Sequence, residues 1–188
     1  MKNKIKSILE ASINDLIQSG DRVQKNHIEE PGGGIVNINF RYEHGTKRFL
    51  IWGLYAGTTD NYPFKIDFLR VRSEEVTSPE DLQALVEQDF EINIPYVQKD
   101  HRFLFITNDN KAFFIDTIDA NSDDVQVRCG CNSYAYSYYK GNKQSRSATG
   151  PAISRPVKGT GKPKPIVAGA CKHLQIIFSI LQETGIVE

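Results

Sequence analysis

The cysteines of this chain fall into two short pairs that together could hold a metal ion. Cys129 and Cys131 are separated by one glycine, and after a long interval Cys171 is separated from His173 by one lysine. These pairs use all three cysteines of the 188 residues. Three sulfur ligands and one imidazole form a set that tetrahedral Zn²⁺ takes in structural sites. The pattern therefore predicts one zinc ion per chain, bound by these four residues.

The spacing of each pair sets a demand on the local backbone. Alternate residues of an extended chain point to the same side, so the first pair can share an ion if residues 125–131 form a strand. Residues two apart on a helix point about 200° apart, so the second pair must lie where the chain turns into a helix. Apolar residues at helical spacing over residues 174–181 predict that helix. Four protein ligands close the tetrahedron, which favours a structural ion over a catalytic one.

Other interpretations of the cysteines stay open. A Cys129–Cys131 disulfide would close a small, strained ring and leave Cys171 without a role. A redox pair more normally reads C-x-x-C. Reduced cysteines packed as small apolar side chains beside a core histidine are the less specific alternative. The odd number of cysteines and the lack of a secretory signal favour a reducing, cytoplasmic setting and a protein that is not secreted.

Charge is distributed unevenly although the formal net charge is zero. Residues 125–182 hold nine basic and no acidic side chains, whereas the other 130 residues hold 14 basic and 23 acidic ones. No apolar run approaches the length of a membrane span, so no membrane partner is expected. A chain of 188 residues can bury one core, or one core and a small appended module.

Hydrophobic periodicity predicts an α+β body over residues 1–124. Apolar residues from Ile5 to Ile17 repeat at helical spacing, with Gly20 as the expected end of that helix. Ser78, followed by a proline and two acids, predicts a second helix start. Alternating residues predict strands over residues 35–42, 47–55, 64–71, 102–107 and 111–118, with hairpin turns at 44–45 and 108–110. We expect one antiparallel, meandering sheet with flanking helices on one side.

Residues 125–188 are expected to form a second unit, a zinc-stapled hairpin and helix module with a long arm. The arm, residues 132–170, holds five glycines, four prolines and no acid. This composition favours a segment whose two ends are fixed by the ion and whose middle stays mobile until something binds it. Tyr134, Tyr136 and Tyr138 alternate at its start, so they could form either a strand face against the main sheet or an exposed binding surface.

The C-terminal stretch resembles the SWIM zinc finger, in which a C-x-C…C-x-H pattern joins a short hairpin and a helix through one ion. It is similar in particular to a long-interval version in uncharacterised proteins of tailed bacteriophages. That version has aromatic residues after the first pair, a glycine- and proline-rich arm, and Cys-Lys-His-Leu at the start of the last helix. The resemblance covers about residues 125–182 and departs at Asn132-Ser133, where such sequences often show Pro-Asp. It implies that Cys129, Cys131, Cys171 and His173 hold structural zinc.

No constellation of catalytic residues is visible in the sequence, so we expect a protein that is not an enzyme. His27, His44 and His101 each stand alone in polar or strand contexts. Gly159-Thr-Gly-Lys162 lacks the spacing of a phosphate-binding loop. Together with the resemblance, this favours a zinc-binding structural or assembly component of a tailed-phage virion, in the neck, tail or baseplate region and assembled in the host cytoplasm. Its arm would contact other virion proteins or copies of itself.

The alternative function is that of a nucleic-acid-binding accessory protein that uses the basic, tyrosine-rich zinc module. Positive side chains beside aromatic rings can bind a phosphate backbone and stack on bases. The competing explanation is that these charges only balance the acidic body. The candidate contact residues, for a partner protein or a nucleic acid, are Tyr134, Tyr136, Lys140, Lys143, Arg146, Arg155, Lys158, Lys162 and Lys164.

Overall fold

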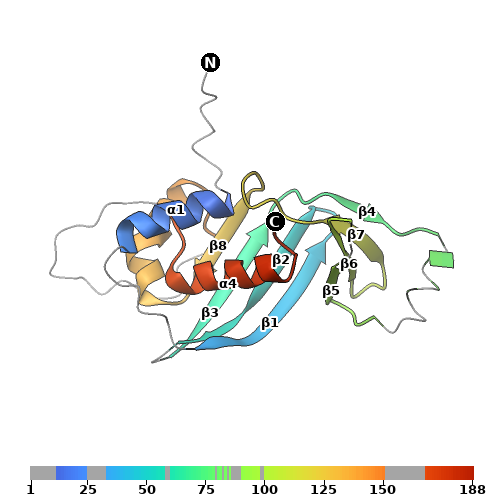
Figure 1. The fold of residues 1–188 in the computed structure, drawn as a ribbon, viewed down its shortest axis with the longest axis horizontal. Helices are drawn as coiled ribbons and strands as arrows, with labels where there is room; N and C mark the ends of the chain where they lie inside the picture. The colour runs from blue at the N-terminus through green and yellow to red at the C-terminus, as the bar shows by residue number, and fades with distance from the viewer. Residues whose placement is uncertain are drawn as a thin grey trace, which may run out of the picture.

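Two four-stranded antiparallel sheets form the frame of the molecule (Figure 1). The computed structural model describes residues 12–24, 33–57, 60–78, 80, 81, 83, 85, 90–97, 100–150 and 168–188. The first sheet has the order β1 (Gly34–Glu43), β2 (Arg48–Ala56), β3 (Asn61–Phe68), β8 (Val125–Cys129). The second sheet has the order β4 (Ser73–Glu75), β7 (Ala112–Asp116), β6 (Arg102–Ile106), β5 (Pro95–Val97).

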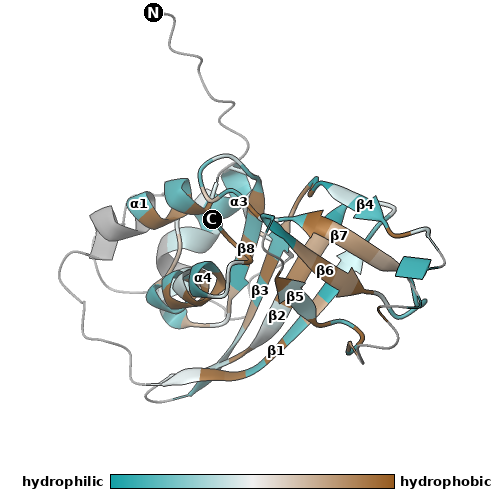
Figure 2. Cartoon of the chain, turned by 45° about the vertical axis from the view of Figure 1, so that its right-hand side comes forward, coloured by the Kyte–Doolittle hydropathy of each residue, from teal (hydrophilic) through white to brown (hydrophobic). Residues whose placement is uncertain are grey.

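In the described part of the chain, three continuous helices and one π-helical turn accompany the sheets. They are α1 (Ile13–Gln24), η1 (Tyr134–Tyr138), α3 (Tyr139–Gln144) and α4 (Lys172–Glu183). In addition, residues 80, 81, 83 and 85 are helical, and the Ser78 hydroxyl accepts a hydrogen bond from the backbone N–H of Asp81, as expected for a helix start. Both α1 and α4 cover the same face of the first sheet (Figure 1). Figure 2 shows that each of these two helices carries both apolar and polar surface.

The two predicted hairpins are confirmed, because alternation and turn residues are local signals. Residues 44–47 form the turn between β1 and β2, and the turn at residues 108–110 joins β6 to β7. In β2 the buried residues Phe49, Ile51 and Tyr55 point to one face, while Trp52 points to the other and is exposed. Gly20 does not end α1, which continues to Gln24, and the part of the predicted helix before Ser12 lies outside the described residues.

The expected single meandering sheet is wrong, because the strands divide into two sheets. The strand β8 joins the first sheet beside β3 instead of forming a hairpin with later residues, and Val127 lies opposite Ile66. Its buried residues Val125, Val127 and Cys129 extend the apolar face of that sheet. Alternation identifies a strand but does not identify a partner more than fifty residues away, and burial of this face decides the pairing.

One apolar cluster joins the two sheets and the last helix. Phe49 of β2 packs against Phe103 and Phe105 of β6, with ring centroids 4.9 and 5.4 Å apart. The buried face of α4, formed by Leu174, Ile177, Phe178 and Leu181, belongs to the same cluster. Each such side chain contributes about 1.5–3 kcal/mol relative to an exposed position. The residue range 125–188 therefore shares its core with the strands before it, and its separate folding stays a prediction.

An exposed ion pair gives one prediction about pH. His101 Nδ1 lies 2.6 Å from Glu188 Oε1. The carboxylate raises the pKa of His101 above its ordinary value of 6.5, and the same hydrogen bond lowers the pKa of Glu188 below 4.5. The contribution of His101 to the stability of the fold is complete below pH 6.5, and it is lost as pH rises through the raised pKa of the folded state. The contribution of Glu188 to stability is complete above pH 4.5, and it is lost as pH falls through the lowered pKa of the folded state.

The pair should therefore stabilise the fold most between pH 4.5 and 6.5. Thermal unfolding midpoints of the wild-type protein and a His101→Gln variant measure the effect. We expect their difference to peak in this window and to shrink at pH 8. A difference that is constant with pH would contradict the prediction.

Candidate metal centre

The four predicted ligands meet in one buried group. Cys129 is the last residue of β8 and Cys131 follows two residues later, while Cys171 is the N-cap of α4 and His173 lies in its first turn. Their ligand atoms all lie within 4.8 Å of one another, and Cys129 Sγ is 3.9 Å from His173 Nδ1. The prediction that the second pair lies where the chain turns into a helix is confirmed, because Cys171 has an extended backbone and the helix starts one residue later.

The dimensions of the group suit a metal ion such as zinc. Zn–S bonds of about 2.3 Å place tetrahedral sulfur ligands about 3.8 Å apart. The three cysteines are free thiols, and all four side chains are buried, with His173 only 4% exposed. Three sulfurs and one imidazole nitrogen are soft and borderline donors of the kind that zinc prefers. This structure contains no Cys129–Cys131 disulfide, because all three cysteines are free thiols.

The pKa values of the three thiols shift in different directions within the group. Hydrogen bonds from the Cys129 and Cys171 thiols lower the pKa of Cys131. The same contact raises the pKa of Cys129, and burial raises the pKa of Cys171. Only one of the three sulfurs is thus favoured as a thiolate when the group is alone, whereas a coordinated thiol loses its proton. Metal binding by this group is therefore expected to release protons.

Two tyrosines hold the histidine ring in place. The ring centroid of His173 lies 5.0 Å from that of Tyr55 on β2 and 4.7 Å from that of Tyr62 on β3, and it is stacked on Tyr62 with an interplanar angle of 21°. The two tyrosines lie opposite each other in the register of the first sheet. This contact fixes the orientation of the imidazole and places α4 against the sheet. Neither tyrosine was predicted as a site residue, because alternation marks only a strand.

The turn that carries Cys131 is fixed by close contacts with β3 and η1. The backbone N–H of Gly130 donates to Pro63 O at 2.8 Å, and a Cβ at this position would lie 2.7 Å from Pro63 Cδ, so glycine is required. The backbone N–H of Tyr134 donates to Cys131 Sγ at 3.3 Å. Such a hydrogen bond orients a sulfur ligand and stabilises its thiolate.

Asn142, which was not predicted as a site residue, joins α3 to the segment just before Cys171. Its side chain is fully buried, donates to Gly169 O at 2.9 Å and accepts from Gly169 N at 2.6 Å. It also donates to the Tyr134 hydroxyl at 3.3 Å. The pair of hydrogen bonds positions the chain two residues before Cys171. The dipeptide Gly141-Asn142 is typical of a turn, yet here it lies within α3.

The predicted contact residues have different fates. Tyr134 is 1% exposed and Tyr138 is fully buried, so the prediction that Tyr134 contacts a partner is wrong. Residues 134–138 form η1, whereas a strand was one of the two predicted alternatives. The reason is that their rings complete the core beneath the cysteine turn. Lys140, Lys143 and Arg146 are exposed. The side chain of Tyr136 and the whole of Arg155, Lys158, Lys162 and Lys164 lie outside what the structure describes.

The first half of the predicted arm is folded. Residues 134–144 form η1 and α3, and residues 147–149 pair with Val127 through hydrogen bonds of 2.7 and 3.2 Å. The buried tyrosines order the start of the arm, over residues 134–149. The expectation that the middle of the arm is mobile falls mainly on residues 151–167, which lie outside the described part of the chain.

A Tyr134→Phe variant should lose about 1 kcal/mol of stability, the net value of one buried hydrogen bond. The Tyr134 hydroxyl donates to Val127 O at 2.5 Å. The loss is small because this carbonyl keeps its hydrogen bond from Thr149 N. Urea unfolding of the zinc-saturated protein measures it, with Tyr139→Phe as the matched control, expected within about 0.5 kcal/mol of wild type. Equal effects of both substitutions would contradict this role.

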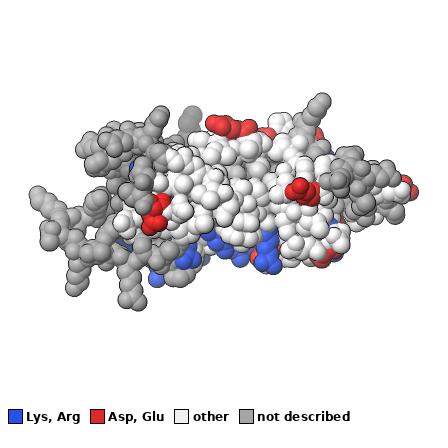
Figure 3. All heavy atoms as spheres, turned by 90° about the horizontal axis from the view of Figure 1, so that it is seen from below, with Lys and Arg blue, Asp and Glu red and all other residues white. Residues whose placement is uncertain are grey.

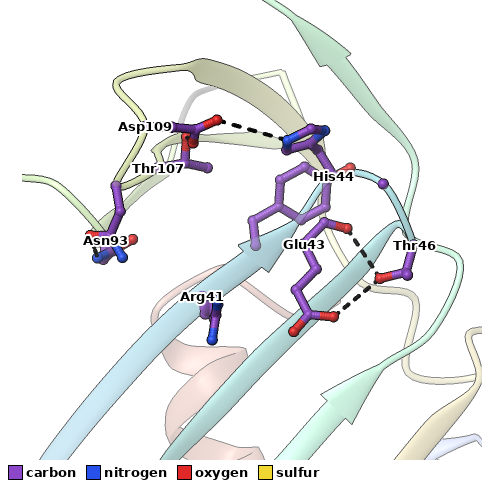
Figure 4. A pocket seen from close by; sticks show the side chains of 10 residues that line it. Arg41, Glu43, His44, Thr46, Asn93, Thr107 and Asp109 are labelled. Carbon is purple, nitrogen blue, oxygen red and sulfur yellow. Dashed lines mark hydrogen bonds and ion pairs between the residues drawn. The ribbon is translucent and has the colours of Figure 1, made fainter.

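A pocket between two hairpin turns offers a second place for chemistry. It has a volume of about 360 Å³ and lies where the β1–β2 turn meets the β6–β7 turn (Figure 4). His44 stacks on Phe113 and its Nε2 lies 3.9 Å from Asp109 Oδ2. The threonine hydroxyls, however, are donated to carboxylates, Thr107 to Asp109 at 2.6 Å and Thr46 to Glu43 at 3.2 Å. Both hydrogen bonds join residues two or three apart in the chain, so they stabilise the two turns.

Comparisons with protein families, with curated proteins and with solved structures find no match for this chain. Among the described helices, none has both the length and the apolar character needed to span a bilayer. The Cys₃His group is therefore the feature on which an assignment of function rests.

Proposed function

We propose that the Cys₃His group binds one structural zinc ion that clamps α4 to the first sheet, in a protein that is not an enzyme. The observation that carries this proposal is the closed, buried arrangement of the ligands. Cys129 and Cys131 come from the end of β8 and the turn after it, Cys171 and His173 come from the start of α4, and 39 residues (132–170) separate the two pairs. Four protein ligands leave no coordination position for a water or a substrate.

We further propose that the protein acts in assembly, as a component of a tailed-phage particle. The support is the resemblance of the C-x-C…C-x-H pattern and its flanking residues to zinc fingers of such phages, together with a zinc group suited to a structural role. In this proposal the protein contacts other virion proteins or copies of itself, and it enters the particle in the host cytoplasm. The zinc keeps the two ends of residues 132–170 close together, so this segment can form a contact without opening the core.

The test of this role is quantitative mass spectrometry of particles purified from a phage whose genome encodes the chain. The proposal expects the protein at a fixed ratio to a known structural protein, and the ratio should survive further purification. Abundance in infected cells with absence from the particles would contradict an assembled component. Elemental analysis of the same material should give one zinc per copy.

A second candidate function, nucleic-acid binding by the zinc module, is supported by exposed cations. Lys140, Lys143 and Arg146 are exposed on α3 and the turn after it, and none forms an ion pair with a described residue. If this surface binds a phosphate backbone, affinity should fall with log salt and should weaken in a Lys140→Gln, Lys143→Gln double variant. No binding at low salt would remove this candidate.

A further inference from the structure

The face of the first sheet opposite α1 and α4 carries a group of polar and basic side chains. Side chains alternate along each strand, so the face opposite α1 and α4 is fixed by the register. We call it the open face. Its residues are Asn37, Asn39, Arg41, Glu43, Arg48, Leu50, Trp52, Leu54, Pro63, Lys65, Asp67, Gln126 and Arg128.

One row across this face combines an aromatic ring with cations. Asn39 lies opposite Trp52, Trp52 lies opposite Lys65, and Lys65 lies opposite Arg128. Neighbouring strands are about 4.8 Å apart, so the row spans about 14 Å. Trp52, the second residue of this row, is 37% exposed and is the only tryptophan of the chain. Arg41, which is exposed, adds a cation one step along β1.

Of the four positive charges on the open face, only Arg48 forms an ion pair with a described residue. Arg41, Lys65 and Arg128 form no ion pair with any residue that the structure describes, and Arg128 Nε is buried without a hydrogen-bond partner among these residues. The two carboxylates of the face are both held by Arg48, which pairs with the buried Asp67 and lies 4.0 Å from Glu43. Figure 3 shows that Lys and Arg gather along one side of the molecule, with most acidic side chains elsewhere.

The open face continues into the basic edge of the zinc-bearing segment. Gln126 on the face donates from Nε2 to Arg146 O at 2.9 Å, and Gly150 lies against the Arg128 guanidinium, since a Cβ there would be 3.0 Å from its Nη1. Arg146 is itself exposed. The cations of the two regions therefore form one surface across the β8 edge, with no acidic residue in sequence from Val125 to Gly150.

We infer that the open face binds single-stranded nucleic acid, with a base stacked on Trp52 and phosphates held by Arg41, Lys65 and Arg128. Stacking of a base on an exposed aromatic ring between cations is the general mode of single-strand binding on a sheet. A duplex hides its bases, and an acidic polypeptide would use the cations but would have no base to stack on the indole. This inference is independent of the virion role, because it concerns the face of the first sheet opposite α4 and survives if the particles lack the protein.

The single tryptophan allows a direct test on the full-length, zinc-loaded chain. Titration with an oligothymidylate at low salt should quench Trp52 fluorescence to saturation. The logarithm of affinity should fall against the logarithm of salt with a slope of about −2, since each of three single-strand phosphate contacts contributes about 0.7. No quenching and no binding at low salt would overturn the inference.

Variants separate this surface from others. By fluorescence anisotropy of a labelled oligonucleotide, Lys65→Gln should flatten the salt slope by about 0.7 and Trp52→Leu should weaken binding about tenfold. Lys111→Gln is the matched control, because Lys111 pairs with Glu75 on the second sheet, and it should change nothing. Loss of binding in Lys143→Gln with no effect of Lys65→Gln would place the contact on α3 and overturn the inference. Polyglutamate that binds as tightly as the oligonucleotide and quenches Trp52 equally would also overturn it.

Discussion

A Cys171→Ser variant is expected to lose its zinc and much of its stability. Cys171 is fully buried at the N-cap of α4, so its sulfur anchors the helix to the strand that carries Cys129. When metal is in excess, each thousandfold loss of metal affinity lowers the free energy of unfolding by about 4 kcal/mol. Because domains of this size have about 5–15 kcal/mol in total, we expect a variant that is unfolded or close to unfolding at 37 °C.

Zinc content and urea unfolding in the presence of zinc measure this loss. Ser179→Ala is the control, because Ser179 is exposed on the same helix. If Cys171→Ser unfolds too readily to measure, chelation of wild-type zinc with hydrogen exchange gives the same information. Since α4 shares its core with β2 and β3, we expect faster exchange in β8 and α4 and also in these strands. Zinc retention and wild-type stability in the variant would contradict the clamp.

An Asn142→Ala variant is expected to lower stability by about 3 kcal/mol although Asn142 touches no ligand. Its side chain satisfies both the N–H and the C=O of Gly169, which is buried. Leaving two buried backbone groups without partners costs about 1–3 kcal/mol each, and truncation of a side chain also leaves a small cavity. Because Gly169 lies two residues before Cys171, the variant should also bind zinc about tenfold more weakly, as loss of outer-shell support does.

Competition with a chromophoric zinc chelator measures the affinity, and urea unfolding measures the stability. Gln144→Ala, on the exposed surface of the same helix, is the matched control and should change neither quantity. A drop in stability with unchanged zinc affinity would show that Asn142 supports the core but does not position the ligands. A variant equal to wild type in both would contradict its role altogether.

The metal ligands could be predicted from the sequence because the spacing of donor residues is a local property. One residue between Cys171 and His173 suits the start of a helix, as found. The strand predicted over residues 125–131 ends at Cys129, so Cys131 reaches the group from the turn after β8. The two hairpins of the body could be predicted for the same reason, because their turn residues are close together in the sequence. The pairing of β8 with β3 could not be predicted from local signals, because any strand with a buried face could have been its partner.

The residues that support the metal group could not be predicted, because their roles arise only in three dimensions. Tyr55 and Tyr62 alternate like other strand residues, and nothing in that pattern places a histidine from α4 between them. Asn142 follows a glycine in a stretch with the composition of a loop, so its place in a buried helix was hidden. Tyr134 was wrongly predicted to contact a partner for the same reason. Composition gives the average polarity of a segment but does not show which of its aromatic rings fill a core.

Zinc-edge X-ray absorption of the purified protein tests the central claim most directly, because it reports the atoms bound to the ion. The Cys₃His group predicts three sulfur neighbours at about 2.3 Å and one nitrogen at about 2.0 Å. A spectrum with no zinc edge, or a shell made only of nitrogen and oxygen, would contradict the account.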